Sequence, residues 1–251
     1  MSQEESTEIE LKPFPSETRT KLIAIGAIIA AVYAISVIVP ISSFIGAGSI
    51  LSLAITIAPL FGILLGPRYG FVFGLIGGVL ATIVSSQFGG LYLAVPTIIF
   101  GPAISGFLTG LSMKRTTKIG NISLPGPLLT SVYLLIIIVL YLIPHYSAWW
   151  FILPYGLAAL TALALQFYQT QLEDISIARF SVSILPFALI GTMTDFSMMT
   201  MGAVYILGLH ADLFGFVIFP VMLIERFLAV IVSTLLASLV IATFGADLGF
   251  Q

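Results

Sequence analysis

Residues 50–81 read ILSLAITIAPLFGILLGPRYGFVFGLIGGVLA and contain two apolar runs joined by a short hinge, GPRYG, at residues 66–70. The only charged residue of the stretch, Arg68, lies in this hinge. Glycines then recur at every fourth position from Gly70 to Gly78. Because lipid provides no hydrophobic force between helices, membrane helices approach closely through small residues on one face. The stretch therefore predicts a helical membrane hairpin whose second arm is tightly packed.

The composition places the whole chain in the same class of protein. Of its 251 residues, 59% are hydrophobic and 8% are charged, whereas about 25% of the residues of a typical soluble domain are charged. The apolar runs are continuous and do not alternate with polar residues, which favours membrane helices over barrel strands. We therefore expect an all-α polytopic membrane protein.

Several functional classes lack their usual sequence signals. The chain contains no cysteine, which excludes disulfides, thiol catalysis and thiolate metal sites. It has no basic cluster suited to nucleic acid, no HExxH metal motif, no serine-nucleophile turn and no phosphate-binding glycine loop. We therefore expect no enzymatic activity, no ATPase site, no metal site, no cofactor and no nucleic-acid partner.

About 20 apolar residues are needed to cross the hydrocarbon core of a bilayer. By this rule the sequence predicts about eight membrane segments, and the seventh contains Asp195 and could be broken. Connecting segments are short apart from 113–124 and 168–181, so residues 21–251 are expected to form a single membrane domain. The expected segments are 21–40, 50–66, 69–86, 91–112, 125–143, 147–167, 182–208 and 214–244.

The lysine and arginine residues predict the orientation, because cytoplasmic loops retain positive charge. With the N-terminus inside, the outer loops 41–49, 87–90, 144–147 and 209–213 contain no lysine or arginine. We therefore expect a multi-pass protein of the cytoplasmic membrane with both termini in the cytoplasm. Residues 1–20 are expected to form a short disordered tail. The positive residues assigned to the inner side are Lys12, Arg19, Lys21, Arg68, Lys114, Arg115, Lys118 and Arg179.

Aromatic residues gather at the expected outer edge of the membrane. Tyrosine and tryptophan favour the headgroup layer, so an aromatic belt is expected there, with His145 exposed beside it. The residues of the expected belt are Tyr141, Tyr146, Trp149 and Trp150.

Three ionisable residues lie within the predicted spans, where an unpaired charge is costly. They are Asp195 in the seventh segment and Glu225 with Arg226 in the eighth. At about 1.5 Å per residue, Asp195 and Glu225 come to similar depths near the midplane. Two interpretations remain open at this point. Asp195 and Arg226 form a buried ion pair that joins two helices, or the three residues form the polar floor of a substrate cavity open to the outside.

Other residues are candidates for the walls of such a cavity or for packing. Met198 lies one turn from Asp195, and methionine adapts to an apolar wall; Tyr92 and His210 lie in outer loops above it. In the first segment Ala27 and Ala31 are four residues apart. Ala30 and Ala34 repeat this spacing, which permits close helix contact. These alanines serve internal packing or form a docking surface for a second membrane protein.

These features together resemble the substrate-binding S component of energy-coupling-factor (ECF) transporters. The resemblance rests on the alanines of the first segment, on IAPLFGILLGPRYGFVFGLIGG and on FGPAISGFLTGLSMKR with its basic inner loop. It covers residues 20–115 best, and it covers the last helix, FPVMLIERFLAVIVSTLLASLVIATF, moderately. The family core has six helices, so the eight expected here imply an added hairpin at 125–167.

The resemblance implies a micronutrient-binding subunit without its own ATPase. Such a subunit works with a transmembrane coupling subunit and ATPase subunits. The alanine face of the first helix would then be the docking surface, and the loop 41–49 a lid over the ligand. We therefore expect uptake of a vitamin or vitamin precursor, with Asp195, Glu225, Arg226, Met198, Tyr92 and His210 around the ligand. The alternative is a self-sufficient secondary transporter in which a midplane acid carries the coupling ion.

Overall fold

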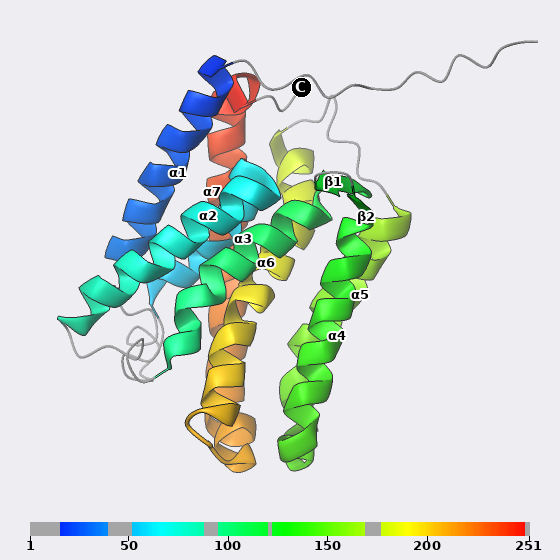
Figure 1. The fold of residues 1–251 in the computed structure, drawn as a ribbon. Coiled ribbons are helices and arrows are strands. Elements are labelled where there is room, and N and C mark those ends of the chain that lie inside the picture. The colour runs from blue at the N-terminus through cyan, green and yellow to red at the C-terminus, as the bar shows by residue number, and fades with distance from the viewer. Residues whose placement is uncertain (1–15, 40–51, 88–94, 120–121, 169–176, 249–251) are drawn as a thin grey trace, which may run out of the picture.

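The computed structural model describes residues 16–39, 52–87, 95–119, 122–168 and 177–248 (Figure 1). Nearly all of these residues are helical. The tail expected at 1–20 lies mostly outside the described residues, and the lid expected at 41–49 lies wholly outside them. The α-helices are α1 (Ser16–Ser36), α2 (Ala58–Ser86), α3 (Gly101–Ser112), α4 (Gly126–His145), α5 (Leu153–Phe167), α6 (Ile177–Tyr205) and α7 (Phe219–Leu248).

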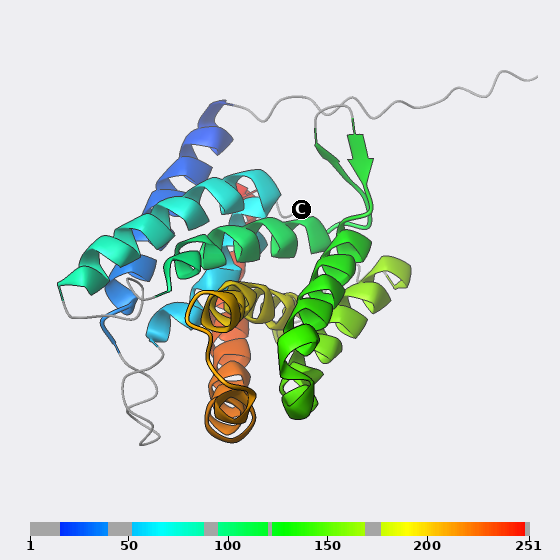
Figure 2. The same ribbon diagram turned by 60° about the horizontal axis from the view of Figure 1, so that its bottom comes forward.

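Shorter elements connect these helices. Two strands, β1 (Thr117–Ile119) and β2 (Ile122–Leu124), pair antiparallel between α3 and α4. This small hairpin projects away from the helices in Figure 2. The remaining elements are three 3-10 turns and one π-helical turn: η2 (Leu53–Thr56), η3 (Pro96–Phe100), η4 (Tyr146–Ile152) and η5 (Leu213–Ile218).

The predicted hinge is present as a sharp bend inside α2. Gly66 has a φ of 71° and a ψ of −177°, a backbone conformation that glycine adopts without steric cost. Residues nine apart are about 13 Å apart along a straight helix. In α2, by contrast, a methyl group at Gly70 would lie 2.6 Å from the carbonyl oxygen of Phe61. The two arms of α2 therefore fold back against each other.

The prediction of eight membrane helices is not supported. The described residues contain five apolar helical segments long enough to cross a membrane, and a shorter apolar helix at Pro96–Ser112. The described part of the expected span 50–66 contains η2 and the first arm of α2, residues 58–65, which is only about 12 Å long. The expected span 69–86 lies in the second arm of α2. Counting apolar residues cannot show where a helix bends. The five segments are Arg19–Ser36, Ala58–Ser86, Gly126–Phe167, Val182–Tyr205 and Leu213–Thr243.

The second arm of α2 packs closely against α3, and the two helices lie side by side in both views (Figures 1 and 2). A methyl group at Gly74 would lie 2.7 Å from the carbonyl carbon of Pro102 and 2.8 Å from the Cα of Ala103. Only a hydrogen atom fits at this distance. The recurring glycines thus allow the backbones to touch, as the sequence predicts.

The helices α4 and α5 form a hairpin beside the other helices (Figure 1). Tyrosine hydroxyl groups attach this hairpin to α6. Tyr133 and Ser197 are joined by a hydrogen bond of 2.6 Å, and Tyr155 and Thr200 by one of 2.7 Å. A third bond runs in the other direction, from the hydroxyl of Tyr205 on α6 to a carbonyl oxygen of α4. Lipid provides no hydrophobic force between helices. Hydrogen bonds and packing therefore hold the hairpin against α6.

The start of α1, the end of α7 and the β1–β2 hairpin lie at one end of the molecule in Figure 1. The turn between α4 and α5 and the turn between α6 and α7 lie at the other end. Lys114 and Arg115 precede β1 and are exposed. The side that faces the cytoplasm stays a prediction from the distribution of charge.

Candidate functional site

The structure brings the three intramembrane ionisable residues together where α6 meets α7. Arg226 Nη1 lies 3.9 Å from Asp195 Oδ2. The side chain of Arg226 is 4% exposed and that of Asp195 is 11% exposed, while Glu225 is fully buried. We call these three residues the polar centre. A buried ion pair and the floor of a cavity remain compatible with this arrangement.

Glu225 and Arg226 are neighbours in the chain, yet both point into the protein. Successive helical residues are separated by about 100°, and the buried stripe of α7 is wide enough to include both. This stripe repeats at intervals of three and four residues, which is typical of a helix with one face turned inward. The buried residues of α7 nearest to the pair are Met222, Ala229, Val230, Ser233 and Thr234.

The guanidinium group of Arg226 is held mainly by α6. Its Nη1 donates a hydrogen bond of 3.1 Å to the carbonyl oxygen of Thr192. Its Cζ lies 4.3 Å from the centre of the Phe196 ring, within the range of a cation–π interaction. Thr192, Asp195 and Phe196 lie within about one helical turn of each other, which explains how a single helix supplies all three contacts.

Asp195 also approaches the start of α3. A methyl group at Gly101, the first residue of α3, would lie 2.6 Å from Asp195 Oδ1. Glycine at this position therefore leaves the space that the carboxylate occupies. Asp195 is in this way the contact point of three helices, α3, α6 and α7.

Two groups of the polar centre have free hydrogen-bonding capacity within the described residues. Neither carboxylate oxygen of Glu225 has a hydrogen-bond partner there, and neither does Nε of Arg226. A buried polar atom without a partner is costly, and such atoms in a native protein call for an explanation such as a ligand or water. The polar centre can therefore accept hydrogen bonds at Glu225 and donate one at Arg226.

The other predicted ligand contacts are placed less favourably. Met198 is half-buried one turn from Asp195, and its carbonyl oxygen accepts a hydrogen bond of 2.7 Å from Thr97 Oγ1. Tyr92 lies outside the described residues. His210 is exposed in the turn between α6 and α7. The structure thus places Met198 near the polar centre and His210 in the turn between α6 and α7.

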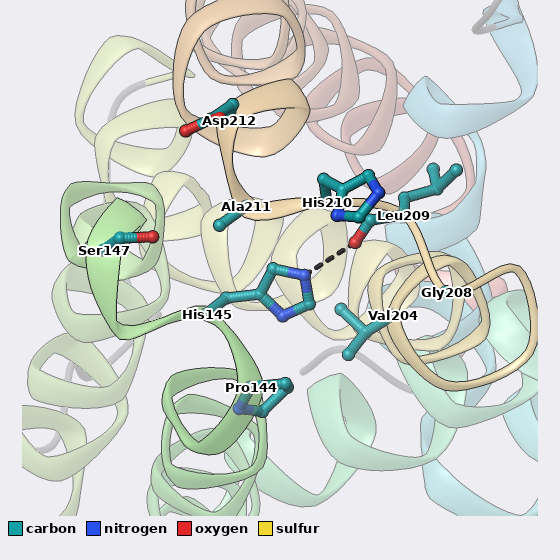
Figure 3. A pocket seen from close by; sticks show the side chains of 9 residues that line it. All are labelled: Pro144, His145, Ser147, Val204, Gly208, Leu209, His210, Ala211 and Asp212. Carbon is teal, nitrogen blue, oxygen red and sulfur yellow. Dashed lines mark hydrogen bonds between the residues drawn. The ribbon is translucent and has the colours of Figure 1, made fainter.

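His210 lines a pocket at the end of the molecule where α4 meets the turn between α6 and α7 (Figure 3). The volume of this pocket is about 440 Å³. Figure 3 shows His145 across the pocket from the turn, with Nε2 2.7 Å from the carbonyl oxygen of Leu209. A carbonyl oxygen only accepts, so Nε2 carries the hydrogen. The residues lining the pocket are Pro144, His145, Ser147, Val204, Gly208, Leu209, His210, Ala211 and Asp212.

The exposed position expected for His145 and the membrane belt expected for Tyr141 are both wrong. His145 is 5% exposed and Tyr141 is fully buried. Their rings stack with centres 5.2 Å apart, and both pack against Phe214. A signal for this was present in the sequence, because residues four apart share a helix face. Of the other expected belt residues, Tyr146 and Trp149 are exposed, and Trp150 donates a hydrogen bond to the carbonyl oxygen of Gly215.

Two of the four alanines of α1 are buried and two are exposed. Ala30 and Ala34 are buried, and a methyl group at Gly77 of α2 would lie 3.5 Å from the Cα of Ala30. They serve packing within the protein and are not available to a partner. Ala27 and Ala31 lie beside them on the helical surface and are exposed.

The described part of the chain contains no group of three or more His, Cys, Asp or Glu residues placed to hold a metal ion.

Comparison with known protein families matches residues 17–191, well over half of the chain, to the family described as ECF-type riboflavin transporter, S component. The matched segment runs from α1 into α6 and includes the α4–α5 hairpin; the polar centre lies beyond it. That the hairpin is an addition to a six-helix core stays a prediction. No curated protein and no solved structure matches the chain. The chain therefore belongs to the family of S components of ECF-type riboflavin transporters, which are membrane subunits that bind the transported substrate.

Proposed function

We propose that this chain binds riboflavin on the outer side of the membrane and releases it on the inner side. The name of its family supports riboflavin as the substrate. Energy for the transport would come from a separate module, made of a transmembrane coupling subunit and ATPase subunits. In this proposal the chain itself performs binding and reorientation and no chemical reaction.

The polar centre is the proposed floor of the riboflavin site, and the free capacity of Glu225 carries this part of the proposal. Both carboxylate oxygens of Glu225 and Nε of Arg226 have no hydrogen-bond partner among the described residues. Riboflavin offers matching groups, because its ring carries an imide N–H flanked by carbonyl oxygens and its side chain carries hydroxyls. Its N–H or O–H groups would donate to Glu225, and a carbonyl oxygen would accept from Arg226.

The remaining predicted ligand contacts have secondary places in the proposal. Met198 contributes an apolar wall one turn from Asp195, and Tyr92, which lies outside the described residues, stays a predicted ligand contact. His210 lies at the outer surface, where it meets the ligand before the ligand reaches the polar centre.

Docking of the energising module is proposed on the exposed face of α1. Ala27 and Ala31 are exposed there, and small residues four apart allow a second helix to approach closely. Ala30 and Ala34 are left out of this surface because they are buried against α2.

Riboflavin binding to the purified chain tests the site. Binding quenches flavin fluorescence, so titration gives the dissociation constant. Removing a hydrogen bond to a charged group is expected to weaken binding about 10- to 100-fold in Glu225→Gln and in Arg226→Gln. Arg115→Gln, at an exposed position that precedes β1, is the matched control and should bind like the wild type.

Two results would contradict the proposal. Absence of riboflavin binding by the wild-type chain at micromolar concentration would exclude the substrate. Unchanged affinity in both Glu225→Gln and Arg226→Gln would exclude the polar centre as the site.

The rival function, ion-coupled transport by the chain alone, is favoured by one observation, the buried carboxylate of Glu225 without a partner among the described residues. Reconstitution distinguishes the two functions. Vesicles that hold only this chain should show no uptake under a proton or sodium gradient, whereas vesicles with the complete module and ATP should take up riboflavin.

A further inference from the structure

We propose that Tyr155 of the α4–α5 hairpin is a positioning residue for the polar centre, because through Phe196 it determines where the guanidinium group of Arg226 lies. The inference rests on the proposed function in one respect, the assignment of Arg226 to the ligand site. The geometry of the three side chains is independent of that assignment.

Side chains from three consecutive helices form a continuous column. The rings of Tyr155 on α5 and Phe196 on α6 are nearly parallel, with an interplanar angle of 14° and centres 6.2 Å apart. The Cζ of Arg226 on α7 lies 4.3 Å from the centre of the Phe196 ring. Offset parallel rings and a cation over a ring are both favourable arrangements. A displacement of the Tyr155 ring therefore reaches Arg226 through a single intervening side chain.

Tyr155 itself is firmly held. It is 1% exposed, and its hydroxyl forms a hydrogen bond of 2.7 Å with Thr200 Oγ1, one helical turn beyond Phe196 on α6. Its ring also packs against Phe151, with ring centres 6.3 Å apart. A side chain fixed at its hydroxyl and at its ring provides a rigid support for the neighbouring aromatic ring.

Arg226 also has polar contacts with α6. Its Nη1 contacts both the carbonyl oxygen of Thr192 and, at 3.9 Å, the carboxylate of Asp195. Its Nε has no hydrogen-bond partner among the described residues. Within the described residues, the contacts of the guanidinium group thus include those of one terminal nitrogen and the one with the Phe196 ring. The position of the Phe196 ring therefore helps to determine the direction in which the Nε–H of Arg226 points.

The hairpin acquires a role from this arrangement. The helices α4 and α5 pack beside α6 and lie to one side of the other helices (Figure 1). Tyr155 nevertheless reaches the polar centre through the column. The hairpin then sets the geometry of the ligand site from outside it.

The experiment compares substitutions along the column with a matched substitution beside it. Tyr155→Leu removes the ring, Tyr155→Met removes it while filling more of its volume, and Tyr155→Phe keeps the ring without the hydroxyl. Tyr141→Leu is the control, because Tyr141 is equally buried in the same hairpin and its ring packs against His145, Phe151 and Phe214. Thermal unfolding of each variant shows whether it is folded.

Two readouts separate the positioning role from the ligand assignment. The first is the Nε–H nuclear magnetic resonance signal of Arg226 in ligand-free protein, assigned by its loss in Arg226→Gln, since ring currents shift the signal of a group above an aromatic ring. The second is the dissociation constant of riboflavin. Tyr155→Leu and Tyr155→Met should shift the signal and weaken binding about tenfold, as expected when a buried cation–π contact is lost. Tyr155→Phe keeps the ring but loses the hydrogen bond to Thr200, so it should change both less than Tyr155→Leu and Tyr155→Met do.

The double variant Tyr155→Leu with Phe196→Leu completes the test. Because Tyr155 acts through Phe196, the double variant should bind riboflavin no more weakly than Phe196→Leu alone. An unchanged Arg226 signal in both folded Tyr155 variants, or an equal loss of riboflavin affinity in Tyr141→Leu, would overturn the positioning role. Unchanged riboflavin affinity in Arg226→Gln would instead overturn the assignment of Arg226 to the ligand site.

Discussion

Replacing Gly74 by alanine tests whether the contact between α2 and α3 depends on the absence of a side chain. The added methyl group would lie 2.7 Å from the carbonyl carbon of Pro102 and 2.8 Å from the Cα of Ala103. Both atoms belong to the backbone of α3, so no side-chain rotation relieves the overlap. The helices must separate by about 0.5–1 Å, which forfeits a quarter to a half of the dispersion energy of the contacts involved.

The expected loss of stability follows from two opposing contributions. Overpacking costs about 1–3 kcal/mol, and the upper part of this range applies because the obstacle is backbone. Replacing glycine by alanine within a helix stabilises the helix by up to about 1 kcal/mol. We therefore expect Gly74→Ala to lower the free energy of unfolding by about 2 kcal/mol, which is roughly a 30-fold change in the unfolding equilibrium.

Gly156→Ala is the matched control, because a methyl group at Gly156 of α5 would meet no atom within 4 Å. This substitution should raise the free energy of unfolding by about 0.5–1 kcal/mol. Denaturant-induced unfolding in detergent micelles, followed by circular dichroism, measures both changes. Equal stability changes in the two variants, or a stabilised Gly74→Ala protein, would refute the packing argument.

Two further substitutions test the bend and the docking surface. Gly66→Ala introduces a side chain at a φ of 71° and a ψ of −177° with no atom in its way, so backbone strain alone should lower the free energy of unfolding by about 1–3 kcal/mol in the same assay; a stability equal to that of the wild type would mean that the bend does not require glycine. Ala27→Trp on the exposed face of α1 should abolish copurification with the energising subunits while leaving riboflavin affinity unchanged. Leu239→Trp, at an equally exposed position of α7, should copurify normally, and normal copurification of Ala27→Trp would contradict docking through α1.

The repeated glycines and the hinge are the part of the fold that the sequence predicts best. Both are local features. A proline inside a helix interrupts its hydrogen bonding, and a glycine before it can adopt the positive φ of a bend; glycines four residues apart leave one face of a helix without side chains. The bend at Gly66 and the close contact at Gly74 follow from these two properties.

The number of membrane helices depends on lengths and directions that hydropathy does not contain. The first arm of α2 is apolar throughout but only eight residues long before Gly66 turns the chain. Residues 126–167 are a continuous apolar helical segment that turns back at η4. A hydropathy window registers the apolar residues in both cases and gives no information on the path of the chain.

For the polar centre, the sequence identifies the charged residues, and the tertiary structure determines what surrounds them. The cost of a charge in lipid identifies Asp195, Glu225 and Arg226 from the sequence, and the structure places them together. The ring of Phe196 beneath Arg226 and the ring of Tyr155 beside it could not be predicted, since aromatic residues are common throughout the chain. Their roles come from the packing of three helices.

The sequence by itself determined the class of the protein, the hinge in its second helix and the three charged residues that require an explanation within the membrane. These conclusions rest on the composition and on the properties of neighbouring residues. Only the tertiary structure decided that Ala30 and Ala34 face inward while Ala27 and Ala31 remain exposed, that His145 and Tyr141 are buried, and that Tyr155 reaches Arg226 through Phe196. The physical reason is that each of these outcomes depends on which helix lies against which, and residues far apart in the chain establish those contacts.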